Sequence, residues 1–371
     1  MITSRMAGAG VAIVASVVIA ACGSSNKKSS STSTASTNNV SATINGAGST
    51  FAAPIYQQWG STLKGQGLTV NYAAVGSGTG VADLQTATAN FAGDDGALKS
   101  SEKSKMKGPV LQFPVAFGSI TLSYNLSGSK SGLKLDGPTI ANIFLGKVKT
   151  WNDPAIKALN PGMNLPSTAI TVAHRSDSSG TTQGFTTYLS DVSPTWSSTV
   201  GKGKIVKWPV GTGGKGNSGV AAIVKQTPGA IGYVEQAYAI ENNFTYAAVK
   251  NKAGTYIQPT IAATSAAATG VAVPADLGIS TINSPNASAY PIASQTFLDV
   301  YRDPCKSGGA STTVAKGVKG FLTYAFGAGQ STLGQGGSQI PYAPLPGSLA
   351  AKDNTQLATM TCNGAAITLS K

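Results

Sequence analysis

One short segment, HRSDSSGTT at positions 174 to 182, gathers the chain's only histidine, one of its three arginines, an aspartate and several hydroxyl residues. These residue types suit a catalytic cluster, a cradle for an anion or a polar loop. A serine hydrolase needs a base beside its nucleophile, but His174 lies on a strand-like segment that turns it away from Arg175. No G-x-S-x-G elbow surrounds it. We therefore expect no catalytic residue here and a structural or surface role for His174.

The groups that phosphatases and metalloenzymes use are also missing from the sequence. It has no CxxC or HExxH motif and no histidine cluster, so we expect neither a metal nor a cofactor. The segment GTGGKGNS at 211–218 loosely resembles a nucleotide-binding loop, but Asn217 stands where that motif requires lysine. The chain is therefore expected to bind a ligand and release it, without being an enzyme.

Small polar turns recur between a strand-like and a helix-like segment. They are GAGSTF at 46–51 before a helix with Pro54 in its first turn, GSGTG at 76–80 before a helix from Val81, and RSDSSGTT at 175–182 between a strand over 170–173 and a helix over 181–189. A helix start leaves backbone N–H groups without partners and carries partial positive charge, which favours a bound oxyanion. One such turn is commonly a helix cap only. Three of them predict helix starts that meet around one anion, and a fourth Gly-rich piece leads into a helix over 218–225.

The N-terminus indicates where the chain resides. Arg5 precedes an apolar stretch that ends in Ile-Ala-Ala-Cys at 19–22, and this ending resembles the lipobox of bacterial lipoproteins. The resemblance implies a signal peptide over 1–21, lipid attachment at Cys22 and retention at the outer face of the cell membrane. An ordinary secretory signal with a chance cysteine is the alternative. Residues 22–40 are rich in Ser and Thr and are expected to form a flexible linker.

Charge and cysteine usage fit an exported protein. The formal charge is +13, but charged residues make up only 11% of the chain and the lysines are scattered, so we expect a solvated basic surface and no nucleic-acid partner. Cys305 and Cys362 form an even pair, and in an exported chain such a pair is predicted to form a disulfide.

Several long motifs then occur in one order. They are GAGSTFAAPIY, GSGTGVADL, FAGDDGAL, DGPTIANIFLGKVKTWNDPAI, LNPGMNLP, RSDSSGTT and GKGNSGVAA followed by TPGAIGYVE. Their order and spacing resemble the PstS family, the phosphate-binding proteins of high-affinity phosphate ABC transporters, from about residue 41 to 246 and more thinly beyond. The resemblance implies an α/β periplasmic-binding-protein fold (type II-like), with two domains joined by crossing strands around a ligand cleft. Chain order then assigns 41–117 and 291–371 to domain I and 118–290 to domain II.

The resemblance also implies a set of phosphate ligands. It assigns this role to the following positions: Thr50, Phe51, Ser77, Asp95, Arg175, Ser179, Gly180 and Thr181. The guanidinium of Arg175 would meet two phosphate oxygens, with Asp177 holding it in place.

Asp95 carries the inference about selectivity. Phosphate keeps a proton near neutral pH and can donate it to this carboxylate, whereas sulfate has none to give. The sequence differs locally from the family pattern because Asp94 precedes Asp95. We assign the ligand role to Asp95 and expect Asp94 to be solvated, with an exchange of the two roles as the alternative.

These inferences predict a monomeric, extracytoplasmic lipoprotein that captures inorganic phosphate and delivers it to the permease and ATPase subunits of a phosphate ABC transporter. Two alternatives stay open at this point. One is a binding protein for another oxyanion such as sulfate, and the other is a phosphate-sensing or adhesive surface protein.

Overall fold

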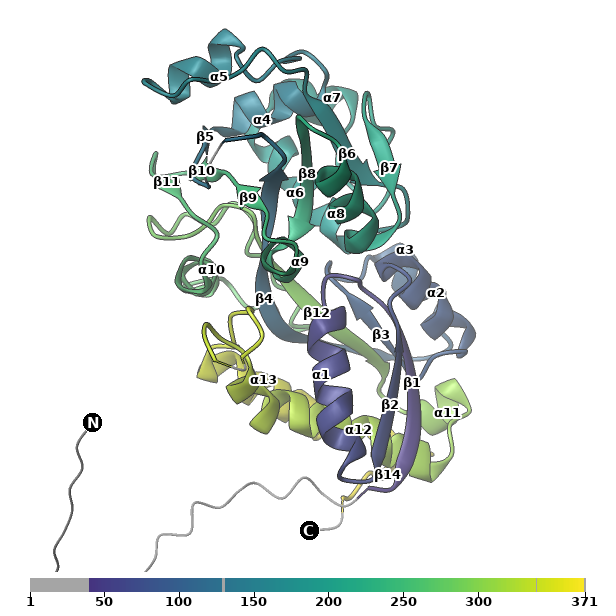
Figure 1. Ribbon diagram of the computed structural model, residues 1–371. Coiled ribbons are helices and arrows are strands. Elements are labelled where there is room, and N and C mark those ends of the chain that lie inside the picture. Colours follow the sequence, from purple (N-terminus) through teal and green to yellow (C-terminus); the bar gives the residue numbers. More distant parts are fainter. Residues whose placement is uncertain (1–39, 129–130, 338, 370–371) are drawn as a thin grey trace, which may run out of the picture. The chain divides into compact units, whose positions relative to one another are not determined.

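Two long strands organise the part of the chain that the computed structural model describes, residues 40–128, 131–337 and 339–369 (Figure 1). Strand β4 (Val110–Tyr124) and strand β12 (Ala293–Tyr301) are antiparallel and pair along 110–119 and 293–301. From Ile120 to Tyr124, β4 pairs instead with β8 (Ala230–Glu235). One strand therefore belongs to both halves of the main sheet.

The main sheet has the strand order β2-β1-β3-β12-β4-β8-β6-β7, with β9 paired to β4. The strands on either side of the central pair are parallel: β1 with β2 and β3, and β6 with β7 and β8. Strand β12 meets β3, and β4 meets β8, in antiparallel fashion. In parallel strands followed by helices, ligands bind at the carboxyl ends of the strands, where the helices begin.

We call the elements beside β12 the first lobe and those beside β8 the second lobe (Figure 1). The first lobe contains β1 (Ala42–Gly48), α1 (Ala53–Lys64), β2 (Leu68–Ala73), α2 (Ser77–Thr86), β3 (Phe91–Asp94), α3 (Ser100–Lys103), α11 (Pro304–Gly308), α12 (Thr312–Phe326), η1 (Ala328–Thr332), α13 (Gly347–Leu357), β13 (Thr361–Cys362) and β14 (Ala365–Ala366). The second lobe contains β5 (Lys134–Leu135), α4 (Gly137–Phe144), α5 (Pro154–Leu159), β6 (Thr171–Arg175), α6 (Gly180–Val192), α7 (Pro194–Thr199), β7 (Thr212–Gly214), α8 (Gly216–Gln226), β8, α9 (Gln236–Glu241), β9 (Thr245–Tyr246), β10 (Ala248–Lys250), β11 (Tyr256–Ile257) and α10 (Ile261–Ala268).

Aromatic side chains fill the core of each lobe. In the first lobe the rings of Phe91 and Phe321 lie 5.1 Å apart, joining β3 to α12. In the second lobe the rings of Phe185 and Tyr233 stack at 4.5 Å, joining α6 to β8. Burial of such rings supplies much of the hydrophobic stabilisation of a domain, so these contacts fix the helices against the strands from which the site is built.

The α/β class expected from the sequence is confirmed, and the ends of several elements are corrected. Helix α2 begins at Ser77 instead of Val81, because close packing of its first turn requires glycine at positions that weaken an isolated helix. Helix α6 extends over Gly180–Val192, and α8 over Gly216–Gln226, each longer than predicted. Strand β6 extends to Arg175, which is therefore the last residue of a strand and not part of the following turn.

Cys305 and Cys362 form the predicted disulfide, with their Cα atoms 5.0 Å apart. The bond joins α11 to β13 within the first lobe. Cys22 lies outside the described residues, as do the expected signal peptide and most of the linker. In the part of the chain that the structure describes, no helix is both long and apolar enough to span a bilayer.

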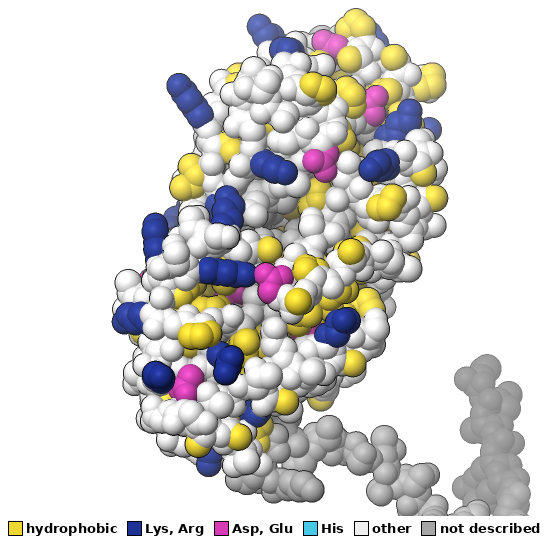
Figure 2. All heavy atoms as spheres, turned by 180° about the vertical axis from the view of Figure 1, so that it is seen from behind, with side chains coloured by type: hydrophobic (Ala, Val, Ile, Leu, Met, Phe, Trp, Pro, Cys, Tyr) yellow, Lys and Arg dark blue, Asp and Glu magenta, His cyan; other side chains and the backbone are white. Residues whose placement is uncertain are grey.

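Figure 2 shows lysine and arginine side chains spread in ones and twos over one face of the molecule, with few acidic side chains among them. They do not gather into a continuous basic patch on this face. This distribution fits the solvated basic surface expected from the sequence.

Candidate functional site

Four helix starts come together between the two lobes. The backbone N–H of Asn217, at the start of α8, donates to the hydroxyl of Thr50, just before α1, over 3.1 Å. The N–H of Gly78, in the first turn of α2, donates to the carbonyl of Ser178, just before α6, over 3.0 Å. The three predicted turns and the fourth Gly-rich piece therefore meet at one place, and the contacts between them cross from one lobe to the other.

Thr50 is held by the second lobe. Its hydroxyl also accepts a 2.9 Å hydrogen bond from the side-chain amide of Asn217, and its carbonyl accepts one of 2.7 Å from the Tyr238 hydroxyl. The next residue, Phe51, is fully buried, and its ring packs edge-on against Tyr342. The side chain of Phe51 therefore belongs to the core, and only its backbone is placed to meet a ligand beside Thr50.

Arg175 is held in one orientation by Asp177 and Thr181. Its Nε and Nη2 donate to the two carboxylate oxygens of Asp177 at 2.7 and 2.5 Å, and its Nη1 donates to the Thr181 hydroxyl at 3.3 Å. The Arg175 side chain is only 1% exposed. Burial raises the pKa of Asp177, but the hydrogen bonds and charge of Arg175 outweigh burial, and the net pKa lies below its usual value. The two groups therefore form a charged, bidentate pair, the arrangement that fixes a guanidinium most firmly.

The start of α6 supplies backbone donors. Ser179 caps the helix, its hydroxyl accepting from the N–H of Thr182 at 3.0 Å, and its own N–H donates to the carbonyl of Lys204 at 2.9 Å. The Ser179 N–H is therefore already paired, whereas its hydroxyl hydrogen is not used by the cap. The N–H groups of Gly180 and Thr181 are among the first four of the helix and have no acceptor within it.

Gly180 lies where a side chain would not fit. A Cβ at this position would lie 2.6 Å from the Ser77 hydroxyl and 2.7 Å from a carboxylate oxygen of Asp95. The start of α6 in the second lobe therefore approaches Ser77 and Asp95 of the first lobe closely.

Asp95 is surrounded by hydroxyl groups. Its Oδ1 accepts from Ser49 at 2.5 Å and from Thr296 at 2.9 Å, and its Oδ2 accepts from Ser77 at 3.4 Å. Burial raises the pKa of Asp95 from 3.8 to about 7, against the hydrogen bond from Ser49, which lowers it. This carboxyl group therefore changes protonation near neutral pH, and it can accept a hydrogen bond from a ligand that carries a proton.

The expectation that Asp94 is solvated was wrong. Asp94 is fully buried, and its Oδ2 lies 2.6 Å from Nζ of Lys204 in the second lobe. Its Oδ1 accepts from the N–H of Gly96 at 3.2 Å. A buried carboxylate is stable when it is paired and hydrogen-bonded, and a lysine distant in the sequence meets that requirement.

Glu235, at the end of β8, is a further acidic group near the site. It is fully buried, and burial raises its pKa well above the usual value, against a hydrogen bond with Tyr342. A protonated Glu235 adds no negative charge. Arg175 and Asp177 balance each other's charge as a pair, and the helix starts favour an anion there.

All eight predicted ligand positions lie in this region, but three contributors were not predicted as site residues. Ser49 and Thr296 hydrogen-bond Asp95, and Asn217 links Thr50 to Thr181 through its side-chain amide. Ser49 precedes a predicted ligand in the same turn, and Asn217 begins a helix after a Gly-rich piece, so both carried a signal. Thr296 lies in a crossing strand that has no polar turn to mark it.

The arrangement can hold a tetrahedral oxyanion between a guanidinium, hydroxyl groups and the N–H groups of helix starts. Among the described residues, no group of His, Cys, Asp and Glu side chains is arranged as a metal site.

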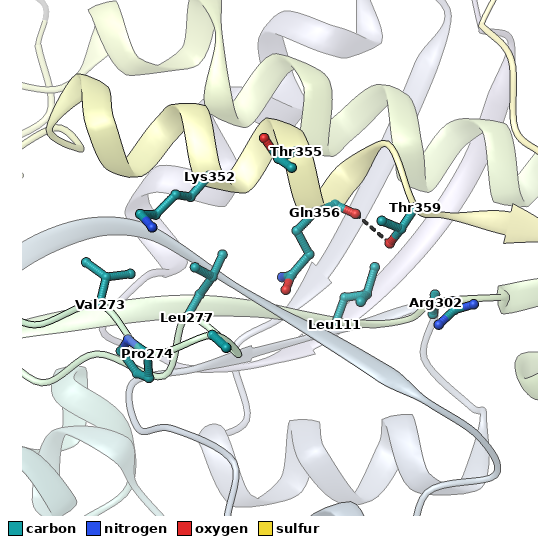
Figure 3. A pocket seen from close by; sticks show the side chains of 10 residues that line it. Leu111, Val273, Pro274, Leu277, Arg302, Lys352, Thr355, Gln356 and Thr359 are labelled. Atoms are coloured by element: carbon teal, nitrogen blue, oxygen red, sulfur yellow. Dashed lines mark hydrogen bonds between the residues drawn. The ribbon is translucent and has the colours of Figure 1, made fainter.

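A separate hollow of about 430 Å³ lies between α13 and the segment that precedes β12 (Figure 3). Val273 and Leu277 form an apolar wall, and Lys352 and Gln356 extend from α13 (Figure 3). The labelled polar side chains come from α13, from the residues after it and, for Arg302, from directly after β12, and they do not converge on one point (Figure 3). None of the predicted ligand residues lines this hollow.

Comparison with known proteins gives a consistent result. Residues 33–328 match the PBP superfamily domain. The phosphate-binding protein PstS of Pasteurella multocida is 41% identical over 321 residues, which are 85% of this chain and 90% of that protein. PstS of Haemophilus influenzae is 40% identical over 85% of this chain and 93% of that protein.

Solved structures agree on the fold. The structure of a high affinity periplasmic phosphate-binding protein bound with phosphate has a TM-score of 0.68 to this chain, at 24% identity, and the match covers 89% of this chain and 96% of that one. The predicted periplasmic-binding-protein fold is confirmed. The chain therefore belongs to the PstS family of phosphate-binding proteins.

Proposed function

We propose that the chain captures inorganic phosphate between its two lobes and delivers it to an ABC-type phosphate permease, without catalysing a reaction. The observation that carries the proposal is the placement of Asp95. This buried carboxyl group lies at the meeting point of the helix starts, is hydrogen-bonded by three hydroxyl groups and borders Gly180 of the opposite lobe. Membership of the PstS family supports phosphate as the anion.

In this proposal the predicted residues divide the phosphate oxygens among them. Arg175, held by Asp177, meets two oxygens through its forked guanidinium. The hydroxyl groups of Thr50, Ser179 and Thr181 and the N–H groups of Phe51, Ser77, Gly180 and Thr181 donate to the oxygens. All of these donors stabilise a negative tetrahedral ion.

Asp95 supplies the selectivity. In its ionised form it accepts a hydrogen bond from the P–OH group of phosphate, which replaces a repulsion by an attraction. Sulfate carries no such proton, so its oxygen would face an unmatched buried carboxylate. The same group thus favours one tetrahedral anion over another of similar size and charge.

The remaining parts of the proposal concern the chain's surroundings. We infer an extracytoplasmic lipoprotein that is anchored through Cys22 by a lipid and acts as a monomer, with the membrane and ATPase subunits of a phosphate transporter as partners. Residues 41–117 and 291–371 would form domain I and 118–290 domain II. The change of partner along β4, between Ser119 and Ile120, supports a hinge in the crossing strands.

Calorimetry of the purified chain with phosphate and with sulfate tests the proposal. We expect phosphate to bind and sulfate to bind more weakly by roughly four orders of magnitude, since an unmatched polar group in a closed site discriminates on that scale. Equal affinity for the two anions, or no binding of phosphate, would contradict the proposal. Incubation with a phosphate ester should release no free phosphate.

A further inference from the structure

Lys204 crosses from the second lobe to the first at a place outside the predicted ligand set. Its Nζ lies 2.6 Å from Oδ2 of Asp94 and 2.9 Å from Oε1 of Glu102, and its side chain is 8% exposed. Asp94 and Lys204 are 110 positions apart in the sequence. We call these three residues the closure cluster.

The backbone around Lys204 is fixed to the second lobe. The carbonyl of Lys204 accepts from the N–H of Ser179, at the start of α6, over 2.9 Å. The N–H of Gly203 donates to the hydroxyl of Thr186, on the same helix, over 3.1 Å. Lys204 is therefore carried by α6, the helix whose first residues are predicted to bind the anion.

The two acidic residues are fixed to the first lobe in the same way. Asp94 ends β3 and accepts from the N–H of Gly96, and Glu102 in α3 accepts through Oε2 from the N–H of Lys99 at 2.8 Å. Beside them, a Cβ on Gly96 would lie 2.5 Å from the side-chain nitrogen of Gln183 on α6. The closure cluster therefore lies in a close contact between rigid parts of the two lobes.

Charges in the cluster favour the ionised lysine. Burial lowers the pKa of Lys204, but Asp94 and Glu102 together raise it above its usual value. Burial raises the pKa of Glu102, and Lys204 outweighs this and lowers it. Asp299 is also buried nearby, and burial, followed by the charge of Asp94, raises its pKa well above the usual value. One cation thus faces two carboxyl groups.

We propose that Lys204 is a positioning residue for anion capture: it reaches Asp94 and Glu102 only when the lobes close, and it neutralises Asp94 as that carboxylate is enclosed beside the bound anion. The inference rests on the proposed function. When the lobes separate, water solvates all three groups, and Asp94 needs no partner. When they close, an unpaired Asp94 would be buried next to Asp95 and to a negative ligand, which opposes closure.

The observed affinity of a closing protein depends on how favourable the closed form is, so the cost of an unpaired Asp94 appears as weaker binding. Lys204→Met keeps an unbranched apolar side chain, one atom shorter, and removes the charge. We expect it to weaken phosphate binding by roughly 10- to 1,000-fold, mostly through faster release, because breaking one partner of a buried pair leaves an uncompensated charge.

Asp94→Asn separates this effect from a loss of packing. Alone, it removes the charge that requires a partner, and Lys204 keeps Glu102, so we expect a change in affinity of less than about threefold. The double variant that combines it with Lys204→Met should bind phosphate at least about tenfold more tightly than Lys204→Met alone. Lys202→Met, an exposed lysine in the same loop, is the matched control and should bind phosphate as the unmodified chain does.

Calorimetry and stopped-flow release of phosphate, with circular dichroism of the ligand-free proteins, distinguish the outcomes. If the unmodified chain does not bind phosphate, the proposed function is wrong. If it binds, and Lys204→Met binds and releases phosphate like Lys202→Met, the role of Lys204 is refuted while the proposed function stands. Failure of Asp94→Asn to rescue Lys204→Met, or loss of the ligand-free fold in Lys204→Met, would likewise overturn the inference, since either makes Lys204 a structural residue.

Discussion

Strand β3 ends at Asp94, and Asp95 follows it directly; both carboxyl groups are buried, but their surroundings differ. Asp94 faces a lysine of the other lobe and forms an ion pair at 2.6 Å. Asp95 faces the hydroxyl groups of Ser49, Thr296 and Ser77, and none of the ion pairs among the described residues includes it. Two adjacent carboxyl groups are therefore buried with different partners, a lysine for Asp94 and hydroxyl groups for Asp95.

The difference shows what each surrounding is suited to. Because Asp94 is buried against a lysine, its stability there depends on whether that lysine is in place. A shell of hydroxyl groups, which can donate or accept, leaves Asp95 free to change its protonation. The region around Asp94 is suited to holding the lobes together, and the region around Asp95 to sensing the proton of a ligand.

Among the variants, Asp95→Asn should have the largest effect on the difference between the two carboxyl groups. The amide cannot act as a negative acceptor for a P–OH group and no longer repels sulfate, so we expect the preference for phosphate over sulfate to fall by roughly 10³- to 10⁴-fold. Competition calorimetry with both anions measures this ratio. A variant that still excludes sulfate would show that another group provides the selectivity.

The same substitution should change how stability depends on pH. Since burial raises the pKa of Asp95 from 3.8 to about 7, the folded chain retains a proton that the unfolded chain has lost between these values. The contribution of Asp95 to the free energy of unfolding is therefore full below about pH 4 and is lost as the pH rises to about 7, by about 4 kcal/mol at most.

Urea unfolding in phosphate-free buffer checks this prediction. The stability of the unmodified chain should fall relative to Asp95→Asn across that interval, and parallel curves would contradict it. Asp353→Asn is a useful control away from the site. Asp353 on α13 is fully buried, and burial raises its pKa to about 8, so its removal should act with the same sign.

Arg175→Ala tests the cation nearest to the predicted ligand. It removes a guanidinium that is 1% exposed and held by Asp177, and we expect phosphate affinity to fall by roughly 100-fold. Arg302→Ala removes an exposed arginine and should leave the affinity unchanged. Equal affinities of the two variants, measured by calorimetry, would place the anion elsewhere.

Asp94→Asn should have the smallest effect on selectivity. Because Asp94 is paired with Lys204 and not with the ligand, we expect the ratio of phosphate to sulfate affinity to stay within about threefold of that of the unmodified chain. A large loss of selectivity, in the same competition experiment, would mean that the two carboxyl groups share one role.

The polar turns could be located from the sequence alone, but the contacts between them could not be predicted from it. Gly, Ser and Thr before a helix are local signals, so the regions of Thr50, Ser77 and Thr181 could be found from their neighbours. The partner of Asp94 could not, because Lys204 is distant in the chain and lies in a loop with no motif of its own. Adjacent acidic residues look alike in a sequence, and only the packing of the lobes makes one buried and paired.

Element ends were missed for a related reason. Helix α2 begins four residues earlier than predicted because glycines, which weaken a helix in isolation, are tolerated where the chain packs closely: Gly80 against Ala47 and Gly48, and Gly78 against Ser178. Arg175 was assigned to a turn, but pairing of β6 with β7 extends the strand through it. In both cases tertiary contacts override the local preference of the residues.

The disulfide between Cys305 and Cys362 has a covalent consequence for the first lobe. It spans 57 positions and encloses α12 and α13 within one closed loop of chain. A single proteolytic cut anywhere inside that loop leaves both new ends attached to the same molecule. The C-terminal portion of the lobe therefore stays with the sheet after such a cut, for as long as the bond remains oxidised.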